Sequence, residues 1–361
     1  MTFTLSLERA RRKPPFRHPN ALELRAKIIW EGAIIVQVSG ERLRIDTRAD
    51  HHTGSRLIED ARAGLAARQK WIPPVHFYDE EGSRLFDAIC DTEEYYPTRT
   101  ETALLEAVSD DVMRAANPRQ LVELGSGTAR KTRILLEAMS RVTGGHSFVP
   151  LDVSEQALRM SARELVDEYE WLDVHGVVGD YERTLALLPS GNRRLFAFLG
   201  STIGNYDDET ATRFLRSIRE RFREGDSLLL GADLVKDADV LRAAYDDAAG
   251  LSAAFNRNML SVLNRELKAN FQLDAFEHVI KWNTIESQIE MHLRARTAQR
   301  VFVGDLQLEV AFAAGETLHT EISRKFTRPR VEALLAQAGF ALREWYTPAN
   351  DYFSLSLAVS D

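Results

Sequence analysis

The segment Val122-Glu123-Leu124-Gly125-Ser126-Gly127-Thr128 follows a short apolar run, and a helical pattern through Ile134 and Leu135 comes soon after it. An apolar strand that breaks at glycines and continues as a helix is how α/β folds bring backbone close to a nucleotide-like ligand. Glycine suits such a break because it has no Cβ to block the ligand and tolerates unusual backbone angles. The motif alone is equally compatible with a tight turn between strand and helix.

The residues around the glycines favour one kind of ligand. Glu123 stands just ahead of them, and the Gly-Lys-Ser/Thr ending of a phosphate-binding loop is missing. A carboxylate repels phosphate but attracts a sulfonium and an amino group. The segment therefore favours S-adenosylmethionine over NAD or ATP.

Two later strand-like runs also end in acids. Asp152 ends the first of them and could accept hydrogen bonds from ribose hydroxyls. Asp180 follows the second and could accept from an adenine amino group, with the Tyr181 ring against the base. The alternative for the first position is that Asp152 or Ser154 only caps the next helix. Three such sites at successive strand ends predict a ligand crevice.

The order of the expected elements predicts an α/β fold. Five strand-like runs, at 120–124, 147–152, 174–178, 195–200 and 227–232, alternate with helical stretches. That alternation predicts a parallel sheet with helices on both faces. After Asp233 the alternation stops: the pattern is helical from Ala238 to about Glu290, and β-rich runs follow at 289–295, 300–303 and 307–313. A helix over 330–338 and strand-like runs at 341–346 and 353–359 close the chain. We expect a class I, Rossmann-like methyltransferase sheet with an inserted second α+β lobe that binds substrate.

This reading divides the chain into five parts. They are an N-terminal extension of unknown role (1–47), the first part of the substrate lobe (48–99), the methyltransferase domain (100–235), the inserted lobe (236–325) and the end of the methyltransferase domain (326–361). Short strands are expected within 26–46, with no function assigned to them. Ligand sites form readily where an insertion covers a crevice.

Composition excludes several classes of partner. The net charge of −8 argues against nucleic acid, which needs a basic footprint. No apolar run approaches the ~20 residues that span a bilayer. The nine histidines show no metal-ligand spacing, so no metal is expected. The single cysteine, Cys90, fits a reducing compartment. We expect a monomeric cytoplasmic protein with a small-molecule substrate.

Asn205 marks the expected place of a methyl acceptor. It follows the fourth strand-like run in Leu199-Gly200-Ser201-Thr202-Ile203-Gly204-Asn205. An acceptor amine must offer a neutral lone pair, and an amide can orient it without stabilising the protonated form. The alternative is a simple turn residue after Gly204, because Asn often takes turns.

A series of motifs in fixed order carries a more specific signal. They are Tyr78-Asp79-x-x-Gly82-Ser83-x-Leu85-Phe86, Glu94-Tyr95-Tyr96-Pro97-Thr98-Arg99, Glu123-Leu124-Gly125-Ser126-Gly127-Thr128-x-x-Lys131-Thr132, the segment ending at Asn205, Ala244-Tyr245-Asp246-Asp247 and Glu321-Ile322-Ser323-x-Lys325-Phe326. Together they resemble the histidine-specific S-adenosylmethionine-dependent methyltransferases, which make trimethylhistidine (hercynine) in ergothioneine biosynthesis. The resemblance runs from about Lys70 to the C-terminus.

The resemblance implies a role for each matched position. Cofactor binding is implied for Glu123, Gly125, Ser126, Gly127, Lys131, Asp152, Asp180 and Tyr181. The carboxylate and α-amino group of the amino acid are implied to contact Tyr95, Asn205 and Tyr245. Glu321 and Ser323 are implied to grip the imidazole, with Met291 lining that end and Tyr78 near the amine. Tyr78 and Asn205 are then the candidate catalytic residues.

Residue chemistry agrees with an imidazole substrate. A carboxylate and a hydroxyl can satisfy both ring nitrogens, and leaving them unpaired costs about 1–3 kcal/mol each. The implied reaction is in-line transfer of methyl groups to the α-amine of L-histidine, three times to give hercynine, the first step of ergothioneine biosynthesis. Two positions depart from the family pattern, Glu93 in place of a proline and Leu251-Ser252 in place of Val-Thr.

Three alternatives stay open at this point. The first is methylation of another free amino acid such as a tryptophan derivative, against which Glu321 argues because an indole offers a single donor. The second is a sensor that binds S-adenosylmethionine or histidine without catalysis. The third is a nucleic-acid or protein methyltransferase, which the acidic charge disfavours.

Overall fold

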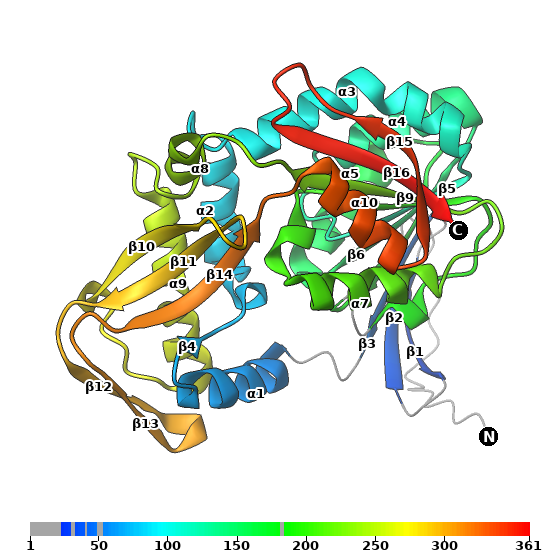
Figure 1. The fold of residues 1–361 in the computed structure, drawn as a ribbon. Helices are drawn as coiled ribbons and strands as arrows, with labels where there is room; N and C mark the ends of the chain where they lie inside the picture. Colours follow the sequence, from blue (N-terminus) through cyan, green and yellow to red (C-terminus); the bar gives the residue numbers. More distant parts are fainter. Residues whose placement is uncertain (1–22, 30–32, 40–41, 49–52, 181–183) are drawn as a thin grey trace, which may run out of the picture.

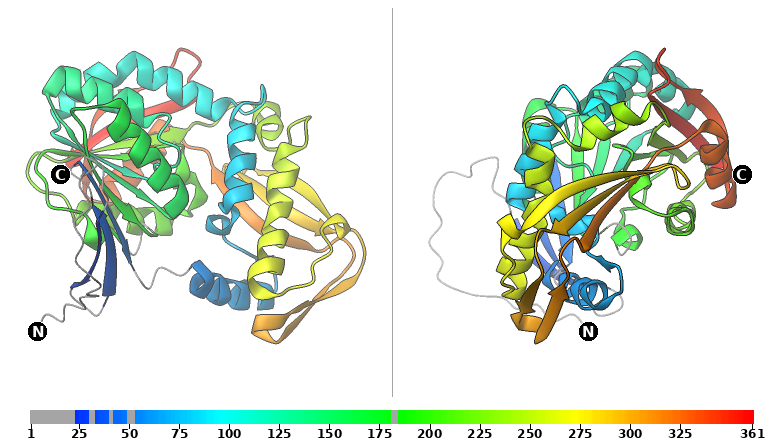
Figure 2. Two further views of the ribbon diagram at one scale, coloured as in Figure 1. Left: turned by 180° about the vertical axis from the view of Figure 1, so that it is seen from behind. Right: turned by 60° about the vertical axis from the view of Figure 1, so that its left-hand side comes forward.

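Two β-sheets of different size form the centres of two lobes that lie side by side (Figures 1 and 2). The computed structural model describes residues 23–29, 33–39, 42–48, 53–180 and 184–361. The larger, ten-stranded sheet has the order β1-β2-β3-β7-β6-β5-β8-β9-β16-β15, and the smaller has the order β10-β11-β14-β4. A separate hairpin, β12–β13, projects from the second lobe.

The strands have the following bounds. Those of the large sheet are β1 (Glu23–Ile29), β2 (Ala33–Ser39), β3 (Leu43–Arg48), β5 (Gln120–Leu124), β6 (Ser147–Asp152), β7 (Asp173–Val178), β8 (Arg194–Phe198), β9 (Ser227–Asp233), β15 (Phe340–Tyr346) and β16 (Phe353–Ser360). The others are β4 (Lys70–Trp71), β10 (Phe276–Asn283), β11 (Gln288–Ala295), β12 (Gln299–Val303), β13 (Leu308–Phe312) and β14 (Thr317–Arg324).

The helices have the following bounds. The α-helices are α1 (Thr53–Ala66), α2 (Glu80–Cys90), α3 (Tyr96–Ala116), α4 (Thr132–Thr143), α5 (Glu155–Glu168), α7 (Asp208–Arg219), α8 (Ala238–Tyr245), α9 (Leu251–Leu267) and α10 (Arg328–Gln337). Short 3-10 turns are η1 (Pro74–Phe77), η2 (Leu185–Leu187), η3 (Thr202–Asn205), η4 (Leu273–Ala275) and η5 (Gly304–Leu306).

The large sheet confirms the predicted α/β class. Strands β3, β7, β6, β5, β8 and β9 run parallel, and β16 and β15 close that edge in antiparallel pairs. The central strands β5, β8 and β9 are buried along their whole length, which explains their continuous apolar runs. Helices α3, α4 and α5 pack on one face, and α7 and α10 pack on the other.

The N-terminal strands extend this sheet at its other edge. Within 26–46 the structure has β1, β2 and β3, and β3 pairs in parallel with β7. The Arg42 guanidinium donates to the backbone carbonyls of Val166, Tyr169 and Leu172 at the end of α5, at 2.7, 2.8 and 3.2 Å. These bonds satisfy the free carbonyls that a helix leaves at its C-terminus.

The second lobe departs from the predicted pattern in two places. The expected helix to about Glu290 is wrong: α9 ends at Leu267, and residues 276–283 form β10, which pairs with β11. Residues 317–324, which the sequence did not mark as a strand, form β14 between β11 and β4. A shift in the β11–β14 pairing between Met291 and His292 leaves Thr320 as an extra residue, so β14 carries a bulge.

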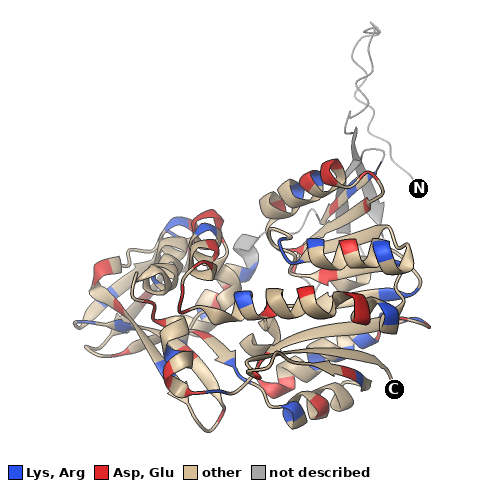
Figure 3. Cartoon of the chain, turned by 90° about the horizontal axis from the view of Figure 1, so that it is seen from above, with Lys and Arg blue, Asp and Glu red and all other residues tan. Residues whose placement is uncertain are grey.

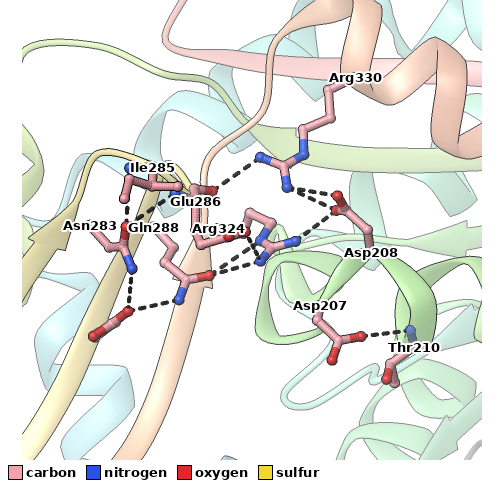
Figure 4. Close-up of polar contacts among 10 residues, drawn as sticks. Asp207, Asp208, Thr210, Asn283, Ile285, Glu286, Gln288, Arg324 and Arg330 are labelled. Atoms are coloured by element: carbon pink, nitrogen blue, oxygen red, sulfur yellow. Dashed lines mark hydrogen bonds and ion pairs between the residues drawn. The ribbon is translucent and has the colours of Figure 1, made fainter.

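Arg324 at the end of β14 ties the two lobes together (Figure 4). Its guanidinium contacts Asp208 of α7 at 2.7 Å, Glu286 at 2.9 Å and Gln288 at 3.1 Å. Arg330 reaches the same Asp208 carboxylate at 2.9 Å. These contacts fix the C-terminal end of β14 against α7, which packs on the large sheet.

Surface charge and helix character complete the description. Acidic and basic residues are interspersed along the outer helices (Figure 3). Among the helices that the structure describes, none combines the length and apolarity needed to cross a membrane.

Candidate active site

A cavity of about 460 Å³ lies where the carboxyl ends of the parallel strands meet the second lobe. Its volume is within the usual range of small-molecule sites. Its lining includes Tyr78, Tyr95, Glu123, Gly125, Ser126, Gly127, Lys131, Asp152, Asp180, Asn205, Tyr245, Met291, Glu321 and Ser323. Every site residue predicted from the sequence is among them except Tyr181, which lies outside the described residues.

The glycine loop forms one end of the cavity. It joins β5 to α4, and both Gly125 and Gly127 have left-handed backbone angles, with φ of 77° and 49°. A Cβ on either glycine would meet no atom within 4 Å and would therefore project into open space. Ser126 Oγ is buried without a hydrogen-bond partner among the described residues. The loop is thus a backbone cradle with a polar atom that a ligand can satisfy.

Glu123 and Asp152 lie beside this loop. The Thr132 hydroxyl donates to the buried Glu123 carboxylate, and burial raises the pKa of Glu123 to about 7. Asp152 accepts from Gly127 N at 2.8 Å and from Ser154 N at 2.9 Å, and burial raises its pKa. Ser154 caps α5 by accepting from Ala157 N at 3.3 Å, as the capping alternative predicted.

Two predicted residues at this end are held by partners that the sequence did not reveal. Lys131 forms an ion pair with Glu101 of α3, a fully buried carboxylate that also accepts from Gly200 N at 2.8 Å. Asp180 forms an ion pair with Arg56 of α1. The third cation that lines the cavity, Arg130, contacts Asp91 at 3.3 Å. Each lining cation in the described part of the chain is thus already paired with a carboxylate.

The other end of the cavity is built where η3 meets β14. Asn205 Nδ2 donates to Glu321 Oε1 at 3.2 Å, so the residues predicted for the amine and the imidazole touch each other. Gly204 allows this approach, because a Cβ there would lie 2.6 Å from the Arg324 carbonyl oxygen. Burial raises the pKa of Glu321 to about 7.

Ser323 and Tyr245 form a hydroxyl pair next to Glu321. Their oxygens are 2.7 Å apart, and the Lys325 ammonium donates to both at 2.8 Å. Lys325 also contacts Asp233 at 2.8 Å and is itself fully buried. Asp233, at the end of β9, therefore anchors a contact chain that reaches the cavity wall.

Aromatic side chains form the remaining wall. The Tyr95 and Tyr245 rings meet edge to face with centroids 6.0 Å apart. Tyr78, just after η1, makes similar contacts with Phe86 and Phe255 at 5.7 and 5.8 Å. Such a wall restricts water access while leaving phenol oxygens for polar contacts. Met291 pairs with Glu321 across β11 and β14.

Sequence reasoning missed four residues around the cavity: Arg56, Glu101, Asp233 and Lys325. Glu101 had a readable signal, since it occupies the apolar side of α3 one turn before the buried Leu104 and Leu105. Asp233 ends a strand, as Asp152 does. Lys325 stands inside a quoted motif but received no role.

The arrangement suits group transfer between two small molecules. Its glycine-loop end combines a backbone cradle with acidic groups, which suits a cationic ligand with hydroxyls. Its other end offers an amide, a carboxylate and hydroxyls for a polar acceptor. Within the described part of the chain, no group of three or more His, Cys, Asp or Glu side chains could hold a metal ion.

Comparison with known proteins identifies relatives over most of the chain. Residues 57–360 match the family described as "Histidine-specific methyltransferase, SAM-dependent". Histidine N-alpha-methyltransferase of Mycolicibacterium smegmatis is 53% identical over 84% of this chain and 94% of its own length. The Mycobacterium tuberculosis protein of that name is 49% identical over the same shares. Ergothioneine biosynthesis protein 1 of Schizosaccharomyces pombe is 29% identical over 76% of this chain and 37% of its own length.

Proposed function

The chain belongs to the family of histidine-specific, S-adenosylmethionine-dependent methyltransferases, and from this premise we propose that it methylates the α-amino group of free L-histidine. We propose three transfers, which give hercynine for ergothioneine biosynthesis. The observation that carries the proposal is that Asn205, Glu321 and the glycine loop border one cavity. A donor and an amino acid bound at its two ends would meet inside it.

The glycine-loop end fits the methyl donor. Gly125 and Gly127 leave room for it, and the unpartnered Ser126 hydroxyl can bind one of its polar groups. Asp152 and Asp180 would accept from ribose hydroxyls and the adenine amino group, with Tyr181 against the base. Glu123 and the Lys131–Glu101 pair would hold its amino-acid part. When bound, S-adenosylmethionine supplies a methyl group on a positively charged sulfur.

The β14 end fits the amino acid. Tyr95, Tyr245 and Asn205 would hold its carboxylate and amino group. Glu321 and Ser323 would contact the two imidazole nitrogens, with Met291 against the ring. Residues 57–96 and 241–318 share one apolar core, which supports 48–99 and 236–325 as two parts of one substrate lobe.

Catalysis by these residues rests mainly on alignment. Holding a nucleophile and an electrophile in line can supply several kcal/mol. Asn205 would keep the amine neutral and aimed, because an amide adds no charge that would stabilise the ammonium form. We propose that Tyr78, through a water molecule, relays to solvent the proton that the amine loses between rounds: its hydroxyl oxygen accepts that proton as the hydroxyl gives up its own.

A variant pair tests the proton-relay role. Tyr78→Phe should lower kcat more than it weakens histidine binding, whereas Tyr346→Phe on β15 serves as a control outside the cavity. Equal losses in kcat and histidine affinity for Tyr78→Phe would exclude the relay role.

The experiment that tests the function is mass spectrometry. The protein is incubated with S-adenosylmethionine and an equimolar pool of the twenty free amino acids. Trimethylhistidine as the product supports the proposal. A methylated product from another amino acid, such as tryptophan, would overturn the pocket assignment but keep the cofactor site. Retained cofactor binding without any product would favour a sensor.

Finer points of this proposal can be checked separately. We propose a monomer that needs no metal ion. A cytoplasmic location is consistent with the single, free and buried Cys90. Light scattering and activity after chelation would test the first two points.

A further inference from the structure

A cluster of buried charges lies behind the hydroxyl pair of Tyr245 and Ser323. Asp233 accepts from two ammonium groups, Lys325 on one oxygen and Lys236 on the other. The Tyr96 hydroxyl donates to Asp233 at 2.7 Å and accepts from Lys236 at 2.8 Å. The side chains of all three charged residues are at most 4% exposed. Neither lysine lines the cavity.

The contacts of Lys325 determine how many hydroxyl protons face the cavity. An ammonium can only donate, so the Tyr245 and Ser323 protons point away from Lys325. One of the two protons makes the hydrogen bond between the hydroxyls. The pair therefore offers the cavity one O–H donor, carried by either Tyr245 or Ser323.

The cluster itself holds two ammonium groups and one carboxylate, and the charge of Lys325 also acts on the buried Glu321 carboxylate, whose pKa it lowers against the larger effect of burial. Lys325 and Lys236 together carry two positive charges when protonated, against one negative charge on Asp233. Burial lowers the pKa of Lys236 to about 8, so that side chain is still mostly protonated at neutral pH. Buried positive charge is costly unless negative charge lies nearby, so the cluster favours an anionic group at this part of the cavity wall.

Among the residues that the structure describes, no cation lines the acceptor end of the cavity. The described cations in the lining are Arg56, Arg130 and Lys131, and each of them is already ion-paired. An amino-acid carboxylate bound at Tyr245 would lie one hydroxyl away from the Lys325 ammonium. Its negative charge would then lie close to the two buried ammonium groups.

We propose that Lys325 is a positioning residue that makes the site select acceptors with a free carboxylate. The inference rests on the proposed function, since it takes an amino acid as the acceptor. When a substrate carboxylate binds at Tyr245, it accepts the Tyr245 hydroxyl proton. The hydrogen bond between the two hydroxyls is then donated by Ser323 to Tyr245, and Ser323 keeps one lone pair that faces the cavity. The carboxylate thereby prepares Ser323 to accept one ring N–H while Glu321 accepts the other, which requires the imidazolium form of the ring. Through these two hydroxyls, Lys325 couples recognition of the substrate's carboxylate to recognition of its ring.

Histidine and histamine differ only in the carboxylate, so comparing their binding separates a role of Lys325 in carboxylate selection from a purely structural role. Dissociation constants of L-histidine and histamine are measured by calorimetry with S-adenosylhomocysteine present. The variants are Lys325→Met and the charge-balanced double variant Lys325→Met with Asp233→Asn, which keeps the test usable should the single variant fail to fold. Arg194→Met is the matched control, because it breaks another buried ion pair, Arg194–Asp226, outside the cavity.

The proposal predicts a selective loss. Histidine affinity should fall by about tenfold in the Lys325 variants, a change of roughly 1.4 kcal/mol, whereas histamine affinity should change less than about twofold. In Arg194→Met the ratio of the two affinities should stay at the wild-type value. Equal losses for both ligands, or no loss for either, would overturn the role of Lys325 alone. Wild-type protein that binds S-adenosylhomocysteine but not histidine would instead overturn the proposed function, and this inference with it.

Discussion

The two ends of the cavity are built by different means. The glycine-loop end uses backbone turns and acids at the ends of adjacent strands, all within residues 123–180. The β14 end uses side chains from distant segments, including Tyr95, Asn205, Tyr245 and Glu321. Buried charges behind the wall hold that second set in place. A site made of local backbone can be read from local sequence, whereas a site made of converging side chains depends on tertiary packing.

The largest effect is expected from a substitution that changes the glycine-loop end of the cavity alone. Gly127→Ala places a Cβ in the cradle and strains a residue at φ 49°. We expect affinity for S-adenosylhomocysteine to fall about 100-fold, roughly 2.8 kcal/mol. Calorimetry measures it, with Gly144→Ala as control because that glycine has φ 63° but does not line the cavity. Similar losses in both variants would contradict the cradle.

A change at the other end should affect only the acceptor. Glu321→Gln removes the charged acceptor that we propose for the imidazole, and a lost hydrogen bond to a charged group is worth about 1.5–3 kcal/mol. Histidine affinity should fall roughly 30-fold, with S-adenosylhomocysteine affinity unchanged. Glu277, a half-buried carboxylate on β10 that is paired with Arg294, gives the control Glu277→Gln. An equal loss of cofactor affinity would show that the two ends are not independent.

A smaller effect is expected where η3 meets β14. Gly204→Ala would put a Cβ 2.6 Å from the Arg324 carbonyl oxygen, so η3 must shift and carry Asn205 with it. We expect kcat/KM for histidine to fall about tenfold, since small misplacements of aligned groups are costly. Steady-state kinetics and cofactor titration would report the two ends separately. Unchanged kcat/KM would mean that the close contact is not needed for alignment.

The smallest effect concerns pH and the glycine-loop end. Burial raises the pKa of Glu123 from 4.5 to about 7 in the folded protein. The folded state therefore binds more protons than the unfolded state between these values, and stability falls as pH rises through the window. Between pH 6.5 and 8 ligand-free wild type should lose roughly 0.8 kcal/mol more than Glu123→Gln. Urea unfolding at the two pH values measures this difference, and parallel curves would contradict the buried proton.

The same comparison explains how much of the fold could be predicted. Strands β5 to β9 were predictable because central parallel strands are continuous apolar runs. The pattern failed at β10, where residues 276–283 mix polar and apolar side chains, most of them half-buried, and pair with β11. It also failed at β14, because the bulge at Thr320 interrupts the alternation and polar residues face the cavity.

The site follows the same division. Asp152, Asp180 and the glycines were placed by their position at strand ends, whereas Glu321 and Ser323 came only from the family resemblance. Glu101 and Lys325 escaped because nothing local marks a charge as buried. Their partners, Lys131 and Asp233, are 30 and 92 residues away along the chain. Only the folded arrangement shows that these charges meet.

The two faces of β14 have a consequence for how this protein can change over time. Glu321 and Ser323 line the cavity, and Arg324, the residue after Ser323, turns the other way to tie the lobes. Because side chains alternate along a strand, inserting or deleting one residue here would exchange the two faces. Ligand choice and lobe attachment would be lost together. Single substitutions in this strand can therefore be tolerated, whereas insertions and deletions cannot.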